Sequence, residues 1–243
     1  AQHLALTGRR VLAVDLDPQA SLSALFGFQP ELDKNPSLYD AIRYDEDRKP
    51  ITDIILPTNF PGLDIIPANL ELQEYEYDTP LAMQTSEEGK RFFTRFGKAL
   101  TEVDPRYDVV IVDCPPQLGY LTLTALTAAT SVLITVHPQM LDLMSMSQFL
   151  LMLGNITRTI KRAGANVQMD WLRYLITRYE PSDVPQTQML GFMQSMLAEE
   201  ILRNPMVKST AISDAGLTKQ SLYEVDRANF NRETYDRAIE CMD

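Results

Sequence analysis

The feature of this sequence that most constrains its fold is a set of short apolar runs in which hydrophobic residues follow one another without alternating with polar ones. Five such β-rich runs are bounded by turn residues: RVLAVDLD, GLDIIPA, YDVVIVDCPP, SVLITVHP and WLRYLITRY. Runs of this kind are typical of strands covered on both faces. The chain is therefore expected to build a parallel sheet.

Segments with helical periodicity separate these runs. They are Ser21–Phe28, Ser37–Arg43, Glu87–Val103, Leu118–Thr130, Leu141–Ala163 and Thr187–Arg203. Strands that alternate with helices predict an α/β fold, with a mostly parallel twisted sheet and helices on both faces. A length of 243 residues suits a single domain over residues 1–243. Within it, the Asp- and Pro-rich residues 29–61 are expected to form a solvated surface excursion with one short helix.

Composition limits the function classes. The formal net charge of −11 argues against a generally basic coat for nucleic acid, although it leaves room for a local basic face. Only two cysteines occur, Cys114 and Cys241, so a disulfide framework is not expected and a reducing cytoplasm is the default compartment. The most apolar long run, from Met140, is short and contains Asp142, which excludes a membrane span there.

Acidic residues stand at the ends of two of the expected strands. Asp15 and Asp17 follow the first run, and Asp113 ends the third, just before Cys114 and two prolines. In open α/β sheets, ligands bind beyond the carboxyl ends of the strands. Carboxylates there can hold Mg²⁺, which prefers oxygen ligands and keeps part of its water shell. The alternative is that each acid caps the helix or turn that follows it. Two such endings in one alternating sheet favour the magnesium site.

These two stretches carry a family resemblance. VLAVDLDPQASLSALFG and YDVVIVDCPPQLGYLTLTAL resemble the deviant-Walker ATPases of the ParA/Soj/MinD family, and within it the RepA-type plasmid-partition proteins of the repABC kind. The resemblance extends over nearly the whole chain and implies a P-loop NTPase fold. It also implies binding of ATP or ADP with Mg²⁺, a nucleotide-dependent homodimer, nonspecific DNA binding and plasmid partition. The implied partner is a centromere-binding ParB-like (RepB-type) protein, and the implied location is cytoplasmic and nucleoid-associated, without membrane binding.

The resemblance also assigns roles in nucleotide chemistry. Asp17 matches the residue that orients the attacking water, and Asp15 matches the strand-end acid that supports the metal and its water shell. Asp113 matches the Walker B acid, an outer-sphere partner of Mg²⁺. Gln19 belongs to a switch loop that responds to the γ-phosphate. These roles agree with phosphoryl transfer in general, where a protein mostly positions groups and stabilises charge.

Further roles fall in the second half of the chain. Thr177 and Arg178 stand where relatives contact the adenine, with a surface salt bridge as the alternative for Arg178. Lys208 matches a basic DNA-contacting position of relatives. Lys161 and Arg162 belong to the most basic window of the chain and are candidates for phosphate contacts whose affinity falls with salt. A solvated helix face is the equal alternative for these basic residues.

One element of the family is not found in the sequence. A glycine-rich loop of the KGGxxKT type, whose backbone N–H groups surround the phosphates, is expected upstream of the DxDPQ strand. The chain instead opens AQHLALTGRR, in which Gln2–Thr7 is expected to form the last turns of a helix that ends at Gly8. We therefore expect a chain truncated just after the P-loop, whose intact parent is an Mg-dependent ATP hydrolase. The 243 residues alone are expected neither to bind ATP tightly nor to hydrolyse it.

Two other classes of function stay open at this point. One is an ATP-gated positioning protein of the MinD type, which acts on a membrane. The tail NRETYDRAIECMD balances its arginines with acids, which weighs against a membrane-binding helix. The other is a non-catalytic DNA-binding repressor or scaffold. The upstream genomic sequence would distinguish them.

Overall fold

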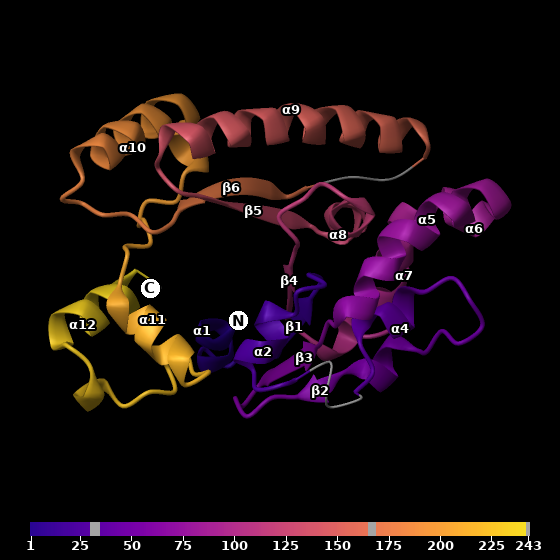
Figure 1. Cartoon of the computed structure of the whole chain (residues 1–243), viewed down its shortest axis with the longest axis horizontal. Coiled ribbons are helices and arrows are strands. Elements are labelled where there is room, and N and C mark those ends of the chain that lie inside the picture. Colours follow the sequence, from indigo (N-terminus) through magenta and orange to yellow (C-terminus); the bar gives the residue numbers. More distant parts are fainter. Residues whose placement is uncertain (30–34, 165–168, 242–243) are drawn as a thin grey trace. The chain divides into compact units, whose positions relative to one another are not determined.

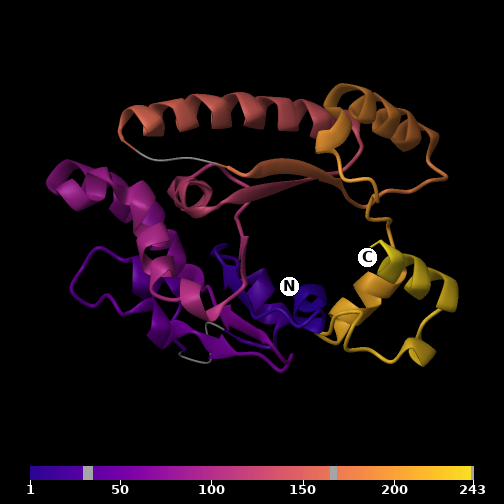
Figure 2. The same cartoon turned by 180° about the vertical axis from the view of Figure 1, so that it is seen from behind.

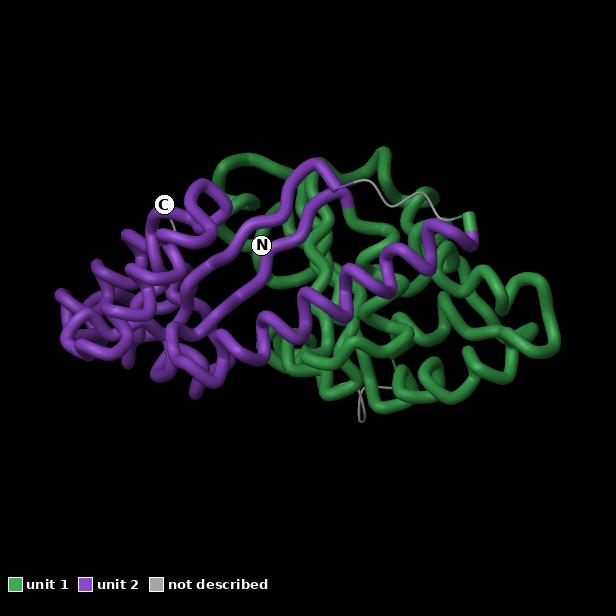
Figure 3. The backbone as a smooth tube through the Cα atoms, turned by 90° about the horizontal axis from the view of Figure 1, so that it is seen from above, with its two compact units in different colours: residues 1–129, 164–167 green, residues 130–163, 168–243 purple. Residues whose placement is uncertain are grey.

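The computed structural model of the chain describes residues 1–29, 35–164 and 169–241, and Figures 1 and 2 show it from two sides. The chain forms two compact units (Figure 3). Unit 1 comprises residues 1–129 and 164–167, and unit 2 comprises residues 130–163 and 168–243. The expectation of one domain over residues 1–243 stays a prediction.

Unit 1 is built on a four-stranded sheet. Its strands are β1 (Val11–Asp15), β2 (Leu56–Pro57), β3 (Leu63–Ile66) and β4 (Val109–Asp113), in the order β2-β3-β1-β4. β1 pairs in parallel with both β3 and β4, whereas β2 pairs antiparallel with β3. The predicted mostly parallel sheet is therefore confirmed in this unit.

Short helices surround this sheet. They are α1 (Gln2–Leu6), α2 (Ser21–Leu25), α4 (Leu38–Ile42), α5 (Glu74–Thr85), α6 (Glu87–Lys90), α7 (Arg95–Thr101) and α8 (Tyr120–Ala128), with 3-10 turns η1 (Ile51–Ile54), η2 (Leu70–Gln73), η3 (Phe92–Thr94) and η4 (Asp104–Arg106). The helix expected at the start of the chain is confirmed, and Gly8 follows it with the expected positive φ of 85°. The single helix expected over Glu87–Val103 is instead broken into α6, η3 and α7. The break lies where two successive rings, Phe92 and Phe93, are both buried.

The two faces of β1 carry different groups. Leu12, Val14 and Leu16 are fully buried in the main core cluster, together with side chains from α4, α7 and α8. Because successive side chains of a strand point to opposite faces, Ala13 and Asp15 lie on the other face of the sheet. Asp15 therefore lies on the face opposite the main core, at the last position of β1.

Part of the surface excursion expected over residues 29–61 packs into the core instead, whereas residues 45–50 are exposed as expected. Leu38 and Ile42 of α4 and Ile51 and Ile54 of η1 are at most 1% exposed and belong to the main core cluster. Their i, i+4 and i, i+3 spacings place each pair on one face of a helical turn, so a polar composition overall still supplies an apolar side. Residues 30–34 lie outside the described part of the chain.

Unit 2 is built on a pair of parallel strands, β5 (Ser131–Val136) and β6 (Trp171–Ile176). Its helices are α9 (Met140–Arg162), α10 (Val184–Leu197), α11 (Thr210–Leu217) and α12 (Arg232–Glu240), with 3-10 turns η5 (Ala198–Glu200) and η6 (Arg227–Asn229). α9 and α10 lie on the same side of the strand pair in both views (Figures 1 and 2). One buried cluster contains Val136 of β5, Ile176 of β6 and Met193 of α10, and side chains of α9 pack against it. Within the described ranges, no helix combines the length and the apolar character needed to cross a membrane.

Candidate functional site

The acids at the ends of the two predicted strands lie side by side. Asp15 and Asp113 are register partners at the last pair of β1 and β4. The N–H of Leu16 donates to the backbone oxygen of Asp113 at 2.9 Å, which fixes the chain just beyond this pair. The expectation that these acids share one edge of the sheet is therefore confirmed.

Asp15 is completely buried, and both of its carboxylate oxygens accept hydrogen bonds. One carboxylate oxygen accepts from the backbone N–H and the hydroxyl of Ser23, at 2.8 and 2.7 Å, and the other accepts from the N–H of Asp17 at 3.2 Å. The Ser23 hydroxyl in turn accepts from the N–H of Ala68 at 3.0 Å. Burial raises the pKa of the Asp15 carboxyl, and the bonds from Ser23 oppose that rise. Asp15 thus ties β1 to α2 and to the chain after β3, as in the capping alternative, and its support of a metal stays a prediction.

Asp17 lies in a tight turn between β1 and α2. Its Oδ1 accepts from the N–H of Gln19 at 3.0 Å, and its backbone oxygen accepts from the N–H of Ala20 at 2.8 Å. Ala20 has a φ of 53°, in the left-handed region that non-glycine residues rarely adopt. Backbone strain of this kind is concentrated at ligand-binding and switch regions. The turn holds the half-buried Asp17 beside the strand-end acids.

Asp113 is the acid of this group that is available to a ligand. The residue is exposed, yet protein atoms around its carboxyl displace water, which raises its pKa, and the negative charges of Asp15 and Asp17 raise that pKa further. A cation at this point would relieve the repulsion. In the described part of the chain, no group of three or more His, Cys, Asp or Glu side chains is arranged to hold a metal directly. The role of Asp113 as an outer-sphere partner of Mg²⁺ stays a prediction.

Cys114 follows Asp113 without adding a ligand. Burial around its sulfur, followed by the charge of Asp113, raises the pKa of the thiol to about 12. The group is therefore protonated at neutral pH, whereas a thiolate is the form that binds metals and attacks substrates.

Replacement of Asp113 by asparagine should stabilise the ligand-free protein at pH 7. The pKa of Asp113 is higher in the folded than in the unfolded protein, so protonation of this carboxyl stabilises the fold. This contribution to stability is complete below the unfolded pKa of about 3.9 and is lost as pH rises through the folded pKa. Asparagine removes the repulsion that remains at neutral pH, and we expect the midpoint of thermal unfolding to rise by about 2 °C. The gain should disappear near pH 3, where the carboxyl of the parent is also neutral. A lower midpoint at pH 7 would contradict the repulsion.

Thr177 and Arg178 follow β6 in unit 2. The N–H of Thr177 donates to the backbone oxygen of Val136 at 2.9 Å, and Arg178 is exposed with a φ of 54°. Among the described residues, Arg178 makes no ion pair that would support the salt-bridge alternative. Its predicted contact with adenine stays a prediction.

The predicted DNA-binding residues are not brought together. Lys161 and Arg162 are exposed in the last turn of α9, which returns to the amino end of β6. Lys208 follows Val207, which bridges to Tyr179 beyond the carboxyl end of β6, and its ammonium donates to Glu180 at 2.9 Å. A six-residue strand spans roughly 20 Å, so these cations occupy opposite ends of the strand pair.

Two residues near the strand ends were not predicted. Ser23 bonds Asp15, as described above. Glu76 of α5 accepts from the N–H groups of Tyr120 and Leu121, at 2.9 and 2.8 Å, and so caps α8 after the loop that follows Asp113. The one sequence signal was Gly119 at the cap position of α8, since a glycine leaves the first N–H groups of the helix without a side-chain acceptor.

A mostly parallel sheet with paired acids at the carboxyl ends of β1 and β4 defines an α/β class of protein. A family model described as "AAA domain" matches residues 1–166. The chain is 69% identical, over 244 residues, to a protein of Sinorhizobium fredii named "Putative replication protein A", covering 100% of this chain and 60% of that protein. It is 31% identical to the sporulation initiation inhibitor protein Soj of Bacillus subtilis, covering 87% of this chain and 78% of Soj. The chain belongs to the ParA/Soj family of AAA-domain proteins.

Solved structures share the fold. Cobyrinic acid a,c-diamide synthase of Mycobacterium smegmatis, with a bound ATP analog and magnesium, matches at a TM-score of 0.71 and 26% identity, covering 89% of this chain and 85% of that one. Apo McdA of Cyanothece matches at a TM-score of 0.74 and 17% identity, covering 100% and 91%. The chain spans 60% and 61% of the length of the first two curated relatives that it matches.

Proposed function

We propose that a protein carrying these residues is an Mg²⁺-dependent ATPase that partitions plasmid DNA. The observation that supports this most directly is the pairing of Asp15 with Asp113 at the carboxyl ends of parallel strands. A relative named chromosome partitioning protein ParA, from Myxococcus xanthus, supports the partition role. The M. smegmatis synthase binds an ATP analog or ADP together with magnesium.

The chemistry assigned to the chain is positioning and charge stabilisation. Mg²⁺, when bound, would neutralise charge on the phosphates. Asp113 would hold it through water, supported by Asp15, and Asp17 would orient the attacking water from the turn that also contains Gln19. Thr177 and Arg178 would contact the adenine. Each of these roles agrees with a phosphoryl transfer in which the protein makes no covalent bond to the substrate.

The phosphates need a further element. The 243 residues contain no glycine-rich loop of the kind that surrounds phosphates with backbone N–H groups. We therefore propose hydrolysis for a protein that carries these residues together with such a loop.

DNA and protein partners belong to the same proposal. Lys161, Arg162 and Lys208 would bind phosphates of DNA without reading sequence, and the affinity would fall steeply with salt. The nucleotide would control a homodimer, and a centromere-binding ParB-like (RepB-type) protein would stimulate hydrolysis in the cytoplasm, on the nucleoid. Glu180 already pairs with Lys208, so DNA would have to replace a surface ion pair, which is worth little.

Hydrolysis of ATP by the protein carrying these residues tests the proposal. Asp17→Ala is expected to lower kcat at least about 30-fold, since the attacking water loses its positioning group. Asp53→Asn, at an exposed acid of unit 1 away from the strand ends, is the matched control and should retain turnover. Equal turnover in the parent and in Asp17→Ala would reject the role of Asp17, and no turnover in the parent would reject the ATPase.

A further inference from the structure

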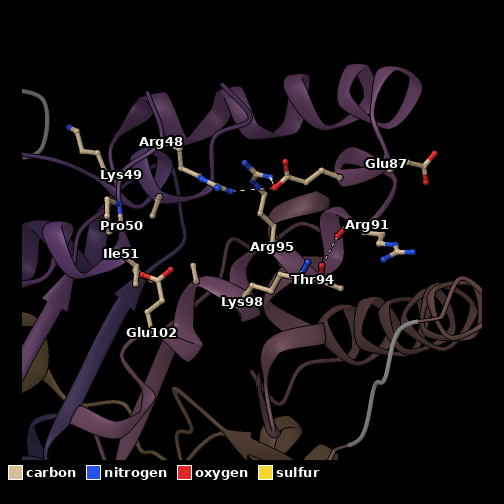
Figure 4. Close-up of a pocket in the computed structure, with 13 residues that line it drawn as sticks. Arg48, Lys49, Pro50, Ile51, Glu87, Arg91, Thr94, Arg95, Lys98 and Glu102 are labelled. Atoms are coloured by element: carbon tan, nitrogen blue, oxygen red, sulfur yellow. Dashed lines mark hydrogen bonds and ion pairs between the residues drawn. The ribbon is translucent and has the colours of Figure 1, made fainter. Parts of the chain in front are cut away.

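Unit 1 contains a cavity of about 770 Å³ that shares no residue with the strand-end site. It lies between the segment from α4 to η1 and the segment from α6 to α7, and Figure 4 shows it in close-up. Five cations line it: Arg48, Lys49, Arg91, Arg95 and Lys98. Three acids line it as well: Glu87, Glu88 and Glu102. The lining therefore has a formal charge of +2, whereas the whole chain has a formal net charge of −11.

Three of these cations lie close together in the sequence. Arg91 directly precedes η3, Arg95 and Lys98 lie about one turn apart in α7, and all three line the cavity. Like charges one turn apart, such as those of Arg95 and Lys98, destabilise a helix by roughly 0.2–0.5 kcal/mol. An anion between them would relieve this repulsion.

The charges of the chain itself neutralise only part of the lining. Glu88 makes ion pairs with both Arg48, at 3.3 Å, and Arg95, and Figure 4 shows these two guanidinium groups pointing toward one another. Lys49 pairs with Asp40 at 3.2 Å. Arg91 and Lys98 make no ion pair with a described residue. Glu87 pairs with Lys90, outside the lining, and its charge also acts on Arg91.

Arg95 is fixed before any ligand arrives. Its side chain is 5% exposed and donates to the backbone oxygens of Ile42 and Arg43, while its guanidinium lies 4.3 Å from the ring centroid of Tyr44. Its remaining nitrogen faces Glu88. A buried cation held by three groups loses little rotamer freedom when it meets an anion, so one wall of the cavity is rigid.

We propose that this cavity binds a small organic molecule that carries phosphate groups. Guanidinium groups match phosphate oxygens in a two-pronged geometry, and Lys98 adds a point charge. Ala41, Ile51 and Ala99 provide apolar wall for an organic part. The volume falls within the range of small-molecule sites, which favours such a ligand over an extended macromolecule. The ligand competes with Glu88 for Arg48.

Calorimetric titration of the purified protein in Mg²⁺-free buffer tests this site, with fructose 1,6-bisphosphate as the probe and fructose as the uncharged control. We expect a dissociation constant below about 1 mM for the bisphosphate and no heat from fructose. Arg91→Gln with Lys98→Gln should weaken binding at least about tenfold. Lys90→Gln, an adjacent cation outside the lining, should leave affinity unchanged. Glu88→Gln should tighten binding severalfold, which a merely structural role of Glu88 does not predict.

Several outcomes would overturn the proposal. Absence of binding by the parent at about 10 mM bisphosphate would do so. Equal weakening by Lys90→Gln would indicate attraction by the general surface charge. Binding of a duplex oligonucleotide that depends on Arg91 and Lys98, without binding of the bisphosphate, would assign the face to nucleic acid instead. Thermal unfolding of each variant separates lost affinity from lost folding. Arg91→Gln and Lys98→Gln remove like-charge repulsion, so they should not lower the midpoint of unfolding.

Discussion

Replacement of Gly89 by alanine is expected to lower the free energy of unfolding of unit 1 by about 3 kcal/mol. A Cβ at this position would lie 2.1 Å from the carbonyl carbon and oxygen of Ala82 and 2.6 Å from the nitrogen of Met83. All three are backbone atoms of α5, so no change of rotamer relieves the contact. α6 would have to move away from α5, and the bond from the N–H of Gly89 to the Ser86 hydroxyl oxygen would be lost.

A matched glycine provides the control. Gly154 lies inside α9, and a Cβ added there meets nothing within 4 Å. Gly154→Ala should therefore stabilise the protein by roughly 0.5–1 kcal/mol, because alanine is the better helix former. Urea unfolding followed by circular dichroism measures both effects. A Gly89→Ala protein as stable as the parent would mean that α6 does not pack against α5 as described.

The second large effect is expected at Gly119, through a single neighbour. A Cβ at Gly119 would lie 2.4 Å from Oε1 of Glu76, and this carboxylate cannot move without giving up its bonds to the N–H groups of Tyr120 and Leu121. Charge-assisted bonds at a helix N-terminus are worth about 2 kcal/mol together in a half-buried position. Gly119→Ala and Glu76→Ala are therefore each expected to destabilise unit 1 by about 2 kcal/mol.

The double variant separates this mechanism from a general loss of packing. Once Glu76 is alanine, the clash at Gly119 no longer exists, so the second substitution should add almost nothing. The interaction energy from the double-mutant cycle should then be close to 2 kcal/mol. Additive losses in the same urea unfolding measurements would show that the Glu76 carboxylate does not occupy the space above Gly119.

The parallel strands could be predicted because each satisfies a local rule. VLAVD and VVIVD are uninterrupted apolar runs that end in acids, and these became the adjacent strands β1 and β4. β2 was missed because it contains two residues, one of them a proline, and its pairing with β3 depends on chain far from it. α5 shows the same limit, since Tyr75 is fully buried and Tyr77, two residues on, is 63% exposed.

The candidate site was likewise predictable only in part. The positions of Asp15 and Asp113 follow from strand length and parallel pairing, which the sequence specifies. The commitment of Asp15 to Ser23 and the capping of α8 by Glu76 arise from contacts between separate elements, which no spacing rule reveals. The cavity beside Arg95 illustrates the limit most clearly, since its cations come from segments more than 40 residues apart. A count of charges along the sequence does not reveal this basic group, because acidic residues lie between these cations.

The chain of hydrogen bonds from Asp15 through Ser23 to Ala68 has a thermodynamic consequence for any ligand of this edge. The turn that contains Asp17 is attached at its base to three segments by bonds that form during folding, before a ligand is present. The entropic cost of ordering this turn is therefore part of the free energy of folding and not of ligand binding. A ligand then binds with higher affinity for the same binding enthalpy.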